Sequence, residues 1–194
     1  MPKISLIIPT FRRYQLLTEA LQSVQEQTFQ DFEVIVVDDH SDDKGETKKI
    51  VERLNDSRFK YIYLDANHGP AYARNQALPY CTGEYLSFLD SDDLLSRRKF
   101  EVHMILLENN PDVAMIYSDE NILYANGKMM GKVHQLWRKS PMPSGYIAKD
   151  FIQESFIGNM TVTLRKSIFE EIGGFDENMA LNEDDDLFFR IMMK

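Results

Sequence analysis

Strand-like and helix-like segments alternate along the first 117 residues, and no other feature of the sequence restricts the fold as strongly. Short runs rich in aliphatic and aromatic residues, the pattern of buried strands, occur at residues 4–8, 32–37, 61–64, 84–88 and 113–117. The intervening segments place apolar residues at helical spacing and predict helices at residues 14–27, 44–54, 69–78 and 96–108. This alternation predicts an α/β fold in which a mostly parallel central sheet carries helices on both faces.

The length of the chain fits one domain. It has 194 residues, of which 43% are hydrophobic, so it can bury a sizeable core. The alternation ends near residue 120, and glycines and prolines then recur up to about residue 163. We expect a single domain over residues 1–194, with a sheet-forming part at about 1–120 and a second part at about 121–194. The helix predicted at residues 184–194 stops without a glycine or proline signal, so we expect a longer natural protein.

Net charge and composition argue against several classes of protein. The formal net charge of −9 argues against nucleic-acid binding, which requires clustered lysines and arginines. The N-terminus enters a strand without a signal sequence, and no apolar run approaches the ~20 residues that span a bilayer. Cys81 is the single cysteine, so no intrachain disulfide can form. These features predict a protein of a reducing compartment, the cytoplasm.

Polar residues follow several of the predicted strands. Pro9-Thr10 comes after the first, Asp38-Asp39 after the second, the acidic run 90–93 after the fourth and Ser118-Asp119 after the fifth. In open α/β sheets, ligands bind beyond the carboxyl ends of the strands. Crowded carboxylates repel one another unless a ligand or a metal offsets their charge, so this edge of the sheet is the predicted binding site.

Two acids, Asp90 and Asp92, follow the strand predicted at residues 84–88. In an extended segment they would point the same way, with Cα atoms roughly 6–7 Å apart and Ser91 pointing away. Because Mg²⁺ is held by one or two carboxylates together with substrate phosphates, the pair predicts a metal–phosphate site. A solvated loop that merely ends the strand is the alternative, since aspartate is common in turns.

A calcium-binding loop fits this run poorly. Glu101 does fall at position 12 counted from Asp90, as an EF-hand requires. Leu94 and Leu95, however, occupy the positions where such a loop needs an oxygen ligand and its turn glycine.

Further motifs accompany these acids in a fixed order over nearly the whole chain. They are SLIIPT (5–10), QTF (27–29), EVIVVDD (33–39), NHGP (67–70), ARN (73–75), GEY (83–85), LDSDD (89–93), GGFDE (173–177) and ED (183–184). With this set the chain resembles the family 2 glycosyltransferases, which have the GT-A fold, a Rossmann-like sheet that binds nucleotide-sugars. The motifs are specific for the family and carry little information about any one activity.

The resemblance implies a nucleotide pocket at the ends of the first two strands. Pro9 and Thr10 would line the base pocket through backbone groups, although ordinary strand termination explains them as well. Asp38 and Asp39 would contact the base and the ribose, because a carboxylate accepts hydrogen bonds from a uracil N3–H or a ribose hydroxyl. A charged turn is the alternative explanation for these two acids.

The same resemblance implies the contacts to metal and diphosphate. Asp92 would bind Mg²⁺ or Mn²⁺ directly, and Asp90 would contact the ribose or a metal-bound water, with Ser91 counted among the nucleotide-binding residues. The ion would neutralise charge that develops on the leaving diphosphate. Arg74 would add a second cation near the donor or pair with an acidic neighbour, and Asn75 would bind ligand or support its helix.

Asp184 is the general base that the resemblance implies. In inverting transfer, a carboxylate removes a proton from the acceptor hydroxyl as that oxygen attacks the anomeric carbon. Glu183, Asp185 and Asp186 compete for the role by proximity. The helix dipole also favours acidic residues in the first turn of a helix, which explains the cluster without any catalysis.

The implied function is that of an inverting, metal-dependent glycosyltransferase. The donor would be a nucleotide-diphospho-sugar, UDP-linked, bound by residues 1–120, and the acceptor a glycan or a lipid-linked sugar on the side of residues 121–194. Trp137 is a candidate for stacking on an acceptor sugar, with packing in a loop as the alternative. The resemblance also implies surface polysaccharide synthesis, with peripheral association at the inner face of the membrane.

Two other classes stay open. A nucleotidyltransferase would share the sheet and the acidic metal site, but it normally carries a Gly-rich, basic loop after the first strand, and residues 9–13 contain no glycine. A non-catalytic module that binds a nucleotide or a carbohydrate is the second.

Overall fold

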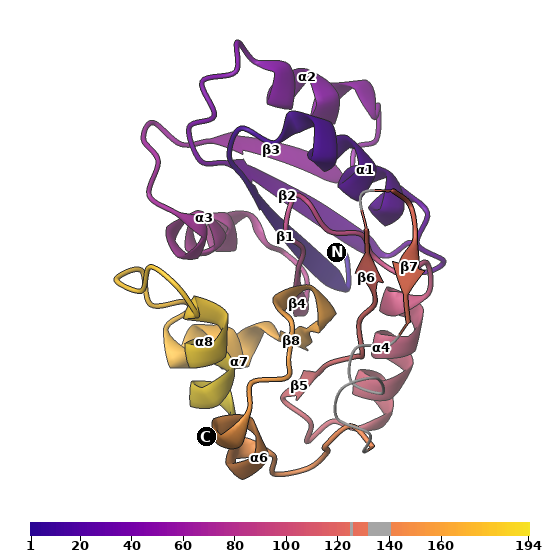
Figure 1. Ribbon diagram of the computed structural model, residues 1–194, viewed down its shortest axis with the longest axis vertical. Helices are drawn as coiled ribbons and strands as arrows, with labels where there is room; N and C mark the ends of the chain where they lie inside the picture. The colour runs from indigo at the N-terminus through magenta and orange to yellow at the C-terminus, as the bar shows by residue number, and fades with distance from the viewer. Residues whose placement is uncertain (125, 132–140) are drawn as a thin grey trace.

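A six-stranded sheet forms the centre of the protein, in the strand order β3-β2-β1-β4-β8-β5 (Figure 1). The computed structural model describes residues 1–124, 126–131 and 141–194. The parallel strands are β1 (Ile4–Thr10), β2 (Phe32–Asp38), β3 (Phe59–Tyr63) and β4 (Tyr85–Phe88). β8 (Thr163–Arg165) pairs antiparallel with β4, and β5 (Met115–Ile116) pairs antiparallel with β8, so β5 runs in the direction of β4.

Helices cover both faces of this sheet. One face carries α1 (Tyr14–Gln25), α2 (Glu46–Arg53) and α4 (Lys99–Asn109). The other carries α3 (Pro70–Ala77), α6 (Ala148–Gln153), α7 (Lys166–Ile172) and α8 (Glu183–Met192). The predicted α/β fold, with a mostly parallel sheet between two helical layers, is therefore confirmed. The described residues also form two 3₁₀ turns, Leu78–Tyr80 and Asn159–Thr161, and a hairpin of β6 (Ile122–Leu123) with β7 (Met129–Met130).

Alternate residues of the central strands enter two separate hydrophobic cores. In β1, Leu6 and Ile8 pack in the core under α1, α2 and α4, whereas Ile7 packs in the core under α3, α7 and α8. Every residue of β1 and β2 is buried, as expected for strands covered on both faces. Full burial of a leucine or isoleucine stabilises the fold by about 1.5–3 kcal/mol relative to exposure, so the two cores hold the sheet as a rigid base for the residues at its edge.

Two predicted elements are shorter in the structure, each for a local reason. α2 begins later than predicted because the Asp43 carboxylate accepts a hydrogen bond from the backbone N–H of Thr47 at 2.9 Å and so caps the helix. The strand predicted at residues 113–117 shrinks to β5, because the carbonyl of Val113 accepts from the side-chain Nε of Arg165 at 2.9 Å instead of from a backbone N–H of the neighbouring strand.

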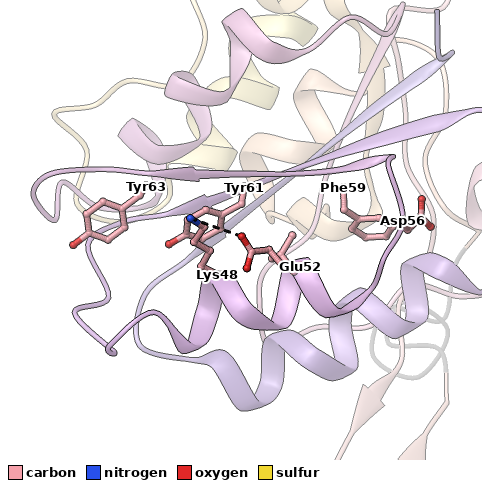
Figure 2. A pocket seen from close by; sticks show the side chains of 7 residues that line it. Lys48, Glu52, Asp56, Phe59, Tyr61 and Tyr63 are labelled. Atoms are coloured by element: carbon pink, nitrogen blue, oxygen red, sulfur yellow. Dashed lines mark ion pairs between the residues drawn. The ribbon is translucent and has the colours of Figure 1, made fainter.

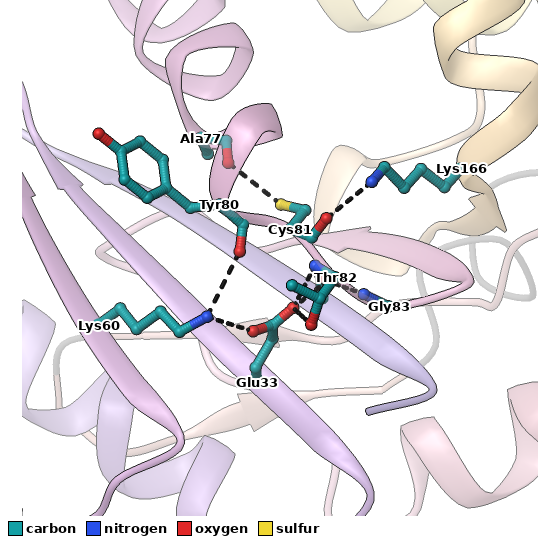
Figure 3. A network of polar contacts seen from close by, with 9 residues as sticks. Glu33, Lys60, Ala77, Tyr80, Cys81, Thr82, Gly83 and Lys166 are labelled. Carbon is teal, nitrogen blue, oxygen red and sulfur yellow. Dashed lines mark hydrogen bonds and ion pairs between the residues drawn. The ribbon is translucent and has the colours of Figure 1, made fainter. Parts of the chain in front are cut away.

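A buried polar network ties the strands together at their amino ends (Figure 3). The Glu33 carboxylate accepts from Ser5 Oγ at 2.7 Å, Thr82 Oγ1 at 2.8 Å and Lys60 Nζ at 2.7 Å. A Cβ on Gly83 would lie 2.7 Å from the backbone nitrogen of Ser5, so only glycine fits beside this network. Burial acts to raise the pKa of Glu33, but the hydrogen bonds lower it to about 2. The carboxylate is saturated with donors, and we assign it a structural role.

Lys99 is a buried ammonium group with neutral partners. Its side chain donates to Ser87 Oγ at 2.6 Å and to the carbonyl of Val162 at 3.1 Å, and the residue is 7% exposed. Within the described ranges, none of its ion-pairing or hydrogen-bonding partners is a carboxylate. Burial lowers the pKa of Lys99 to about 7. Its positive charge and burial together lower the pKa of His103 one helical turn away, burial being the larger cause.

We predict that Lys99→Met raises the free energy of unfolding below pH 7. The folded protein releases the Lys99 proton at about pH 7, whereas the unfolded chain releases it near pH 10.4. Between these values the unfolded chain binds more protons, so the stability of the unmodified protein rises with pH. Urea denaturation from pH 6 to pH 10 is the measurement, and the advantage of Lys99→Met should shrink steadily across that range.

Lys48→Met is the matched control, because the Lys48 side chain is 58% exposed and pairs only loosely with Glu52, at 3.7 Å. Such an exposed pair contributes about 1 kcal/mol or less. A pH-independent difference between Lys99→Met and the unmodified protein would contradict the assignment of Lys99 as a buried, depressed lysine.

Candidate functional site

The carboxyl ends of β1, β2, β4 and β5 lie at one edge of the sheet, because these strands run in the same direction. The structure therefore brings the polar strand ends predicted from the sequence together. Burial, followed by the charges of Asp90, Asp92 and Glu120, raises the pKa of Asp93 to about 6. Glu120 follows β5 and Asp93 follows β4, so acids from two strand ends share one electrostatic environment.

Residues 90–93 form a turn, and the expectation of an extended segment is wrong here. β4 ends at Phe88, and the backbone N–H of Asp93 donates to the carbonyl of Asp90 at 3.1 Å. Aspartate and serine favour such turns because their side chains accept hydrogen bonds from nearby backbone groups. Ser91 is buried, whereas the side chains of Asp90 and Asp92 keep 38% and 40% of their surface exposed. Both acids remain accessible at the edge, although the turn and not the strand presents them.

Asp92 forms an ion pair with Arg13, which follows β1. Both side chains are exposed, 40% for Asp92 and 52% for Arg13, and such pairs contribute about 1 kcal/mol or less. The sequence analysis did not select Arg13. The signal that points to it is the basic pair Arg12-Arg13 directly after a strand end in an otherwise acidic chain.

Arg74 is buried between two acids from distant parts of the chain. Its Nη2 donates to Asp90 Oδ1 at 2.7 Å, and its Nη1 donates to Glu183 Oε1 at 2.6 Å. The guanidinium carbon lies 5.2 Å from the centre of the Phe175 ring, and Arg74 is 3% exposed. With its amide oxygen turned to the guanidinium, Asn159 accepts from Nη2 at 3.1 Å and from Nε at 3.3 Å. Arg74 therefore pairs with acidic neighbours, which was one of the two roles expected from the sequence.

The four acids at the start of α8 have different surroundings. Glu183 is 9% exposed and bonded to Arg74, Asp185 accepts from Ser155 Oγ at 2.5 Å, and Asp186 pairs with Arg190 at 2.7 Å. Asp184 is half-buried, and its carboxylate accepts from the neighbouring backbone N–H of Asp185 at 3.0 Å, with no side-chain donor among the described residues.

Burial raises the pKa of Asp184. The charges of Asp185 and Glu183 act in the same direction, while backbone hydrogen bonds oppose it. A carboxylate with a raised pKa is a stronger base than an ordinary aspartate, which suits proton removal near neutral pH. Of the four acids, Asp184 has the surroundings that best fit a general base.

Asp38 and Asp39 bond to the loops on either side of the nucleotide pocket predicted from the sequence. Asp38 accepts from the hydroxyl of Tyr61 at 2.7 Å and from the backbone N–H of Ser41 at 2.9 Å. Asp39 accepts from the backbone N–H groups of His68 and Gly69, at 3.0 and 2.8 Å, where α3 begins. Both acids are at most 3% exposed. Their carboxylates shape the backbone at the strand end, which favours the charged-turn explanation.

Thr10 carries an unsatisfied buried oxygen. Its carbonyl accepts from the backbone N–H of Asp39 at 2.9 Å, which continues the pairing of β1 with β2. Its hydroxyl oxygen is buried and, alone among the buried side-chain nitrogen and oxygen atoms of the described residues, has no hydrogen-bond partner. An orphaned buried hydroxyl costs free energy unless a ligand or water satisfies it. Pro9, directly before it in β1, is also buried.

The residues at the β4 turn fit a hard divalent cation. Asp90 and Asp92 each use one oxygen for an arginine and keep an exposed surface, and carboxylate oxygens are the ligands that Mg²⁺ and Mn²⁺ prefer. Among the residues that the structure describes, no three or more histidine, cysteine, aspartate or glutamate side chains form a cluster suited to a metal ion. A cation held by these two acids would take its other ligands from water or from a bound diphosphate.

A surface groove of about 520 Å³ lies between α2 and β3, away from these acids (Figure 2). Lys48 and Glu52 of α2 face Phe59, Tyr61 and Tyr63 of the edge strand. Apart from Trp137, the site residues predicted from the sequence belong to the described ranges, and none of these lines this groove. Tyr61 links the groove to the site, because its hydroxyl donates to Asp38.

Asn75 supports the loop that leads to α8 and does not face the acids. Its Nδ2 donates to the carbonyl of Phe175 and to Glu177 Oε1, both at 2.9 Å, and its Oδ1 accepts from the backbone N–H of Phe175 at 3.0 Å. This amide therefore fixes the 173–177 loop against α3, a role different from the ligand binding or support of its own helix expected from the sequence. Trp137, the candidate for acceptor stacking, lies outside the described residues.

The chain matches the family model "Glycosyl transferase family 2" over residues 5–173. An uncharacterized glycosyltransferase of Rickettsia conorii is 35% identical over 193 residues, which cover 99% of this chain and 30% of that protein. A GalNAc(5)-diNAcBac-PP-undecaprenol beta-1,3-glucosyltransferase of Campylobacter jejuni is 34% identical over 187 residues, 94% of this chain and 58% of that protein. The chain thus spans less than two thirds of the length of either relative.

The fold is similar to that of S. aureus TarS 1–349, crystallised in complex with UDP-GlcNAc. The TM-score is 0.80 at 25% identity, over 98% of this chain and 53% of the TarS chain.

We predict that Gly174→Ala destabilises the loop before α8 more than Gly173→Ala does. Both glycines have positive φ, +76° and +88°, so both alanine variants share the cost of a left-handed backbone. Only at Gly174 would the new Cβ lie 2.7 Å from Asn75 Oδ1, which breaks the Asn75 contacts, whereas Gly173 has no atom within 4 Å. The difference in unfolding free energy should be about 1 kcal/mol or more, measured by urea denaturation.

The double variant Gly174→Ala with Asn75→Ala separates the steric cause from backbone strain. Without the Asn75 amide, the extra cost at Gly174 should disappear. Equal effects of the two single glycine variants would contradict the role given to Asn75.

Proposed function

The chain belongs to glycosyl transferase family 2, and we propose that it is the catalytic domain of an inverting glycosyltransferase with a UDP-linked donor. The observation that carries this proposal is the continuous acidic edge of the sheet. Asp90 at the end of β4 is joined through Arg74 to Glu183, the residue before Asp184. A donor site and a candidate base are thereby parts of one site.

The donor site proposed here extends from β1 to β4. The orphaned hydroxyl of Thr10 supports a ligand at the end of β1, where Pro9, Asp38, Asp39 and the β4 turn surround it. The solved relative TarS holds UDP-GlcNAc on a similar fold, which supports a uridine nucleotide as the first donor to test. Asp92, with Asp90, would hold Mg²⁺ or Mn²⁺, and that ion would neutralise negative charge on the diphosphate leaving group.

The proposed reaction is a single displacement. The acceptor hydroxyl loses its proton to Asp184 as its oxygen forms the new bond to the anomeric carbon, and the bond from that carbon to the diphosphate breaks with both electrons leaving on the diphosphate. The raised pKa of Asp184 suits this step. Arg13, beside Asp92 and exposed, is available to a diphosphate as a second positive charge once a cation takes its place on Asp92.

The proposed acceptor is a lipid-linked glycan. The Campylobacter relative is named for an undecaprenol-diphosphate acceptor, which supports a role in surface glycan synthesis and work at the inner face of the membrane. No helix within the described ranges combines the length and apolar character needed to cross a bilayer. Acceptor contacts would come from residues 121–194.

We predict that Asp184→Asn abolishes transfer and leaves donor binding intact. Loss of a general base typically lowers kcat by about 10²–10⁴-fold, while UDP affinity in MnCl₂, measured by calorimetry, should stay unchanged. The rate of the unmodified enzyme should fall on acidification through the pKa of Asp184, which lies above its ordinary value. Asp186→Asn is the control and should keep its turnover, because Asp186 lies two positions after Asp184 and pairs with Arg190.

We predict that Asp92→Ala abolishes the manganese dependence of UDP binding. Calorimetric titrations of UDP with MnCl₂ and with EDTA give the comparison, and removal of the metal from the unmodified protein should weaken UDP binding as the substitution does. Unchanged, metal-dependent binding in Asp92→Ala would refute the metal assignment. UDP binding without any transfer or donor hydrolysis by the unmodified protein would instead favour a non-catalytic module.

A further inference from the structure

Arg74 has no surface to offer a donor. It is 3% exposed, and each of its three guanidinium nitrogens already has a partner: Nη1 with Glu183, Nη2 with Asp90, and Nε with the Asn159 amide. The Phe175 ring lies 5.2 Å from the guanidinium carbon. A side chain enclosed in this way acts on the acids that it holds and not on a ligand.

Glu183 has an equally defined position. It is the first residue of α8 and is 9% exposed, with its carboxylate bonded to Arg74 at 2.6 Å. The preceding residue, Asn182, has a left-handed backbone with φ of 60° and gives the helix no side-chain cap. The first residue of α8 is therefore held by its ion pair with Arg74 and not by a capping side chain.

We propose that Arg74 and Glu183 are positioning residues that together hold Asp184 at a fixed place relative to the donor carboxylate Asp90. This inference rests on the proposed function, since it assigns Asp184 a proton-transfer role. One guanidinium fork bridges the turn after β4 and the first turn of α8, segments that lie far apart in the sequence. Arginine suits the task because its planar fork bonds two carboxylates at once, which a lysine ammonium on a flexible stem does not do with the same geometry.

The bridge has a consequence for binding. A ligand or cation that binds the Asp90 carboxylate alters the hydrogen bond from Arg74 Nη2 to Asp90. Because Arg74 also bonds to Glu183, that change is passed on to Glu183. We therefore expect donor binding at the sheet edge to order the first turn of α8, where the backbone N–H of Asp186 donates to the carbonyl of Asn182 at 3.1 Å. Donor binding and placement of the base are coupled by this route.

The test uses Glu183→Gln, which keeps the size of the side chain and removes its charge, and Arg74→Lys. For Glu183→Gln we expect kcat to fall by about 10- to 100-fold, because a catalytic base that is slightly misplaced transfers the proton less efficiently. The Kd for UDP in MnCl₂ should stay within about threefold of the value for the unmodified protein. The pH at which the rate falls on the acidic side should also move down, because Glu183 is one of the charges that raise the pKa of Asp184. The other groups beside Asp184 are Asp185 on the same helix and Arg74 on α3, and neither is altered in this variant.

Arg190→Lys is the matched control for Arg74→Lys. Arg190 also bridges α8 to another segment, donating to Asp186 Oδ2 at 2.8 Å and to the carbonyl of Gly174 at 2.8 Å, but it touches neither Asp90 nor Glu183. The Arg190→Lys variant should lose stability but keep the coupling between donor binding and the first turn of α8. If Arg74→Lys fails to fold, the isosteric Glu183→Gln carries the test alone.

Hydrogen exchange gives a readout that does not depend on turnover. UDP with MnCl₂ should slow exchange in the first turn of α8 in the unmodified protein and in Arg190→Lys, and should not do so in Glu183→Gln. A weaker affinity of Arg74→Lys for UDP, with kcat at saturation unchanged, would overturn the proposal in favour of Arg74 as a donor ligand. Unchanged kcat and intact ligand-induced protection in Glu183→Gln would overturn it as well. Absence of transfer in the unmodified protein, with the exchange coupling present, would refute the proposed function and leave the coupling standing.

Discussion

Negative charge gathered at one edge of the sheet is the constraint on which the rest of the structure depends. The parallel strands deliver their carboxyl ends, and the acids that follow them, to the same place. Arg13 forms an ion pair with Asp92, and Arg74 forms one with Asp90. Burial and neighbouring carboxylates nevertheless raise the pKa of Asp93 to about 6. Two arginines therefore leave the edge with uncompensated negative charge, which is what a site for a divalent cation and a diphosphate needs.

The two ends of the strands use the same chemical group in opposite ways. At the amino ends, Glu33 accepts hydrogen bonds from four groups, three side-chain donors and one backbone N–H, and its pKa falls to about 2. At the carboxyl ends, burial raises the pKa of Asp184 and of Asp93, because donors are too few to offset the loss of water. Burial of a carboxylate thus marks structure where donors saturate it and a candidate site where they do not.

The features that follow from backbone topology were predictable from the sequence. Alternating strands and helices indicated the sheet, its two helical layers and the edge that carries Asp90, whereas Asp184 was selected from the family resemblance. What the sequence lacked is pairing between distant residues, such as Arg13 with Asp92 and Arg74 with Glu183. Local chemistry also misled in one place, since the preference of aspartate and serine for turns overrode the extended path expected for residues 90–93.

The rank of Asp184 among its neighbours follows from the same accounting of partners. Position in the helix does not separate the four acids at the start of α8, because the helix dipole stabilises each of them. Their partners do separate them: Glu183 is held by Arg74, Asp185 by Ser155 and Asp186 by Arg190. A base must accept a proton from a substrate, so a carboxylate committed to an arginine is a poor one. Among the described residues, Asp184 combines partial burial with a carboxylate that no cation holds, and in our proposal the pairing of Glu183 with Arg74 keeps it in place.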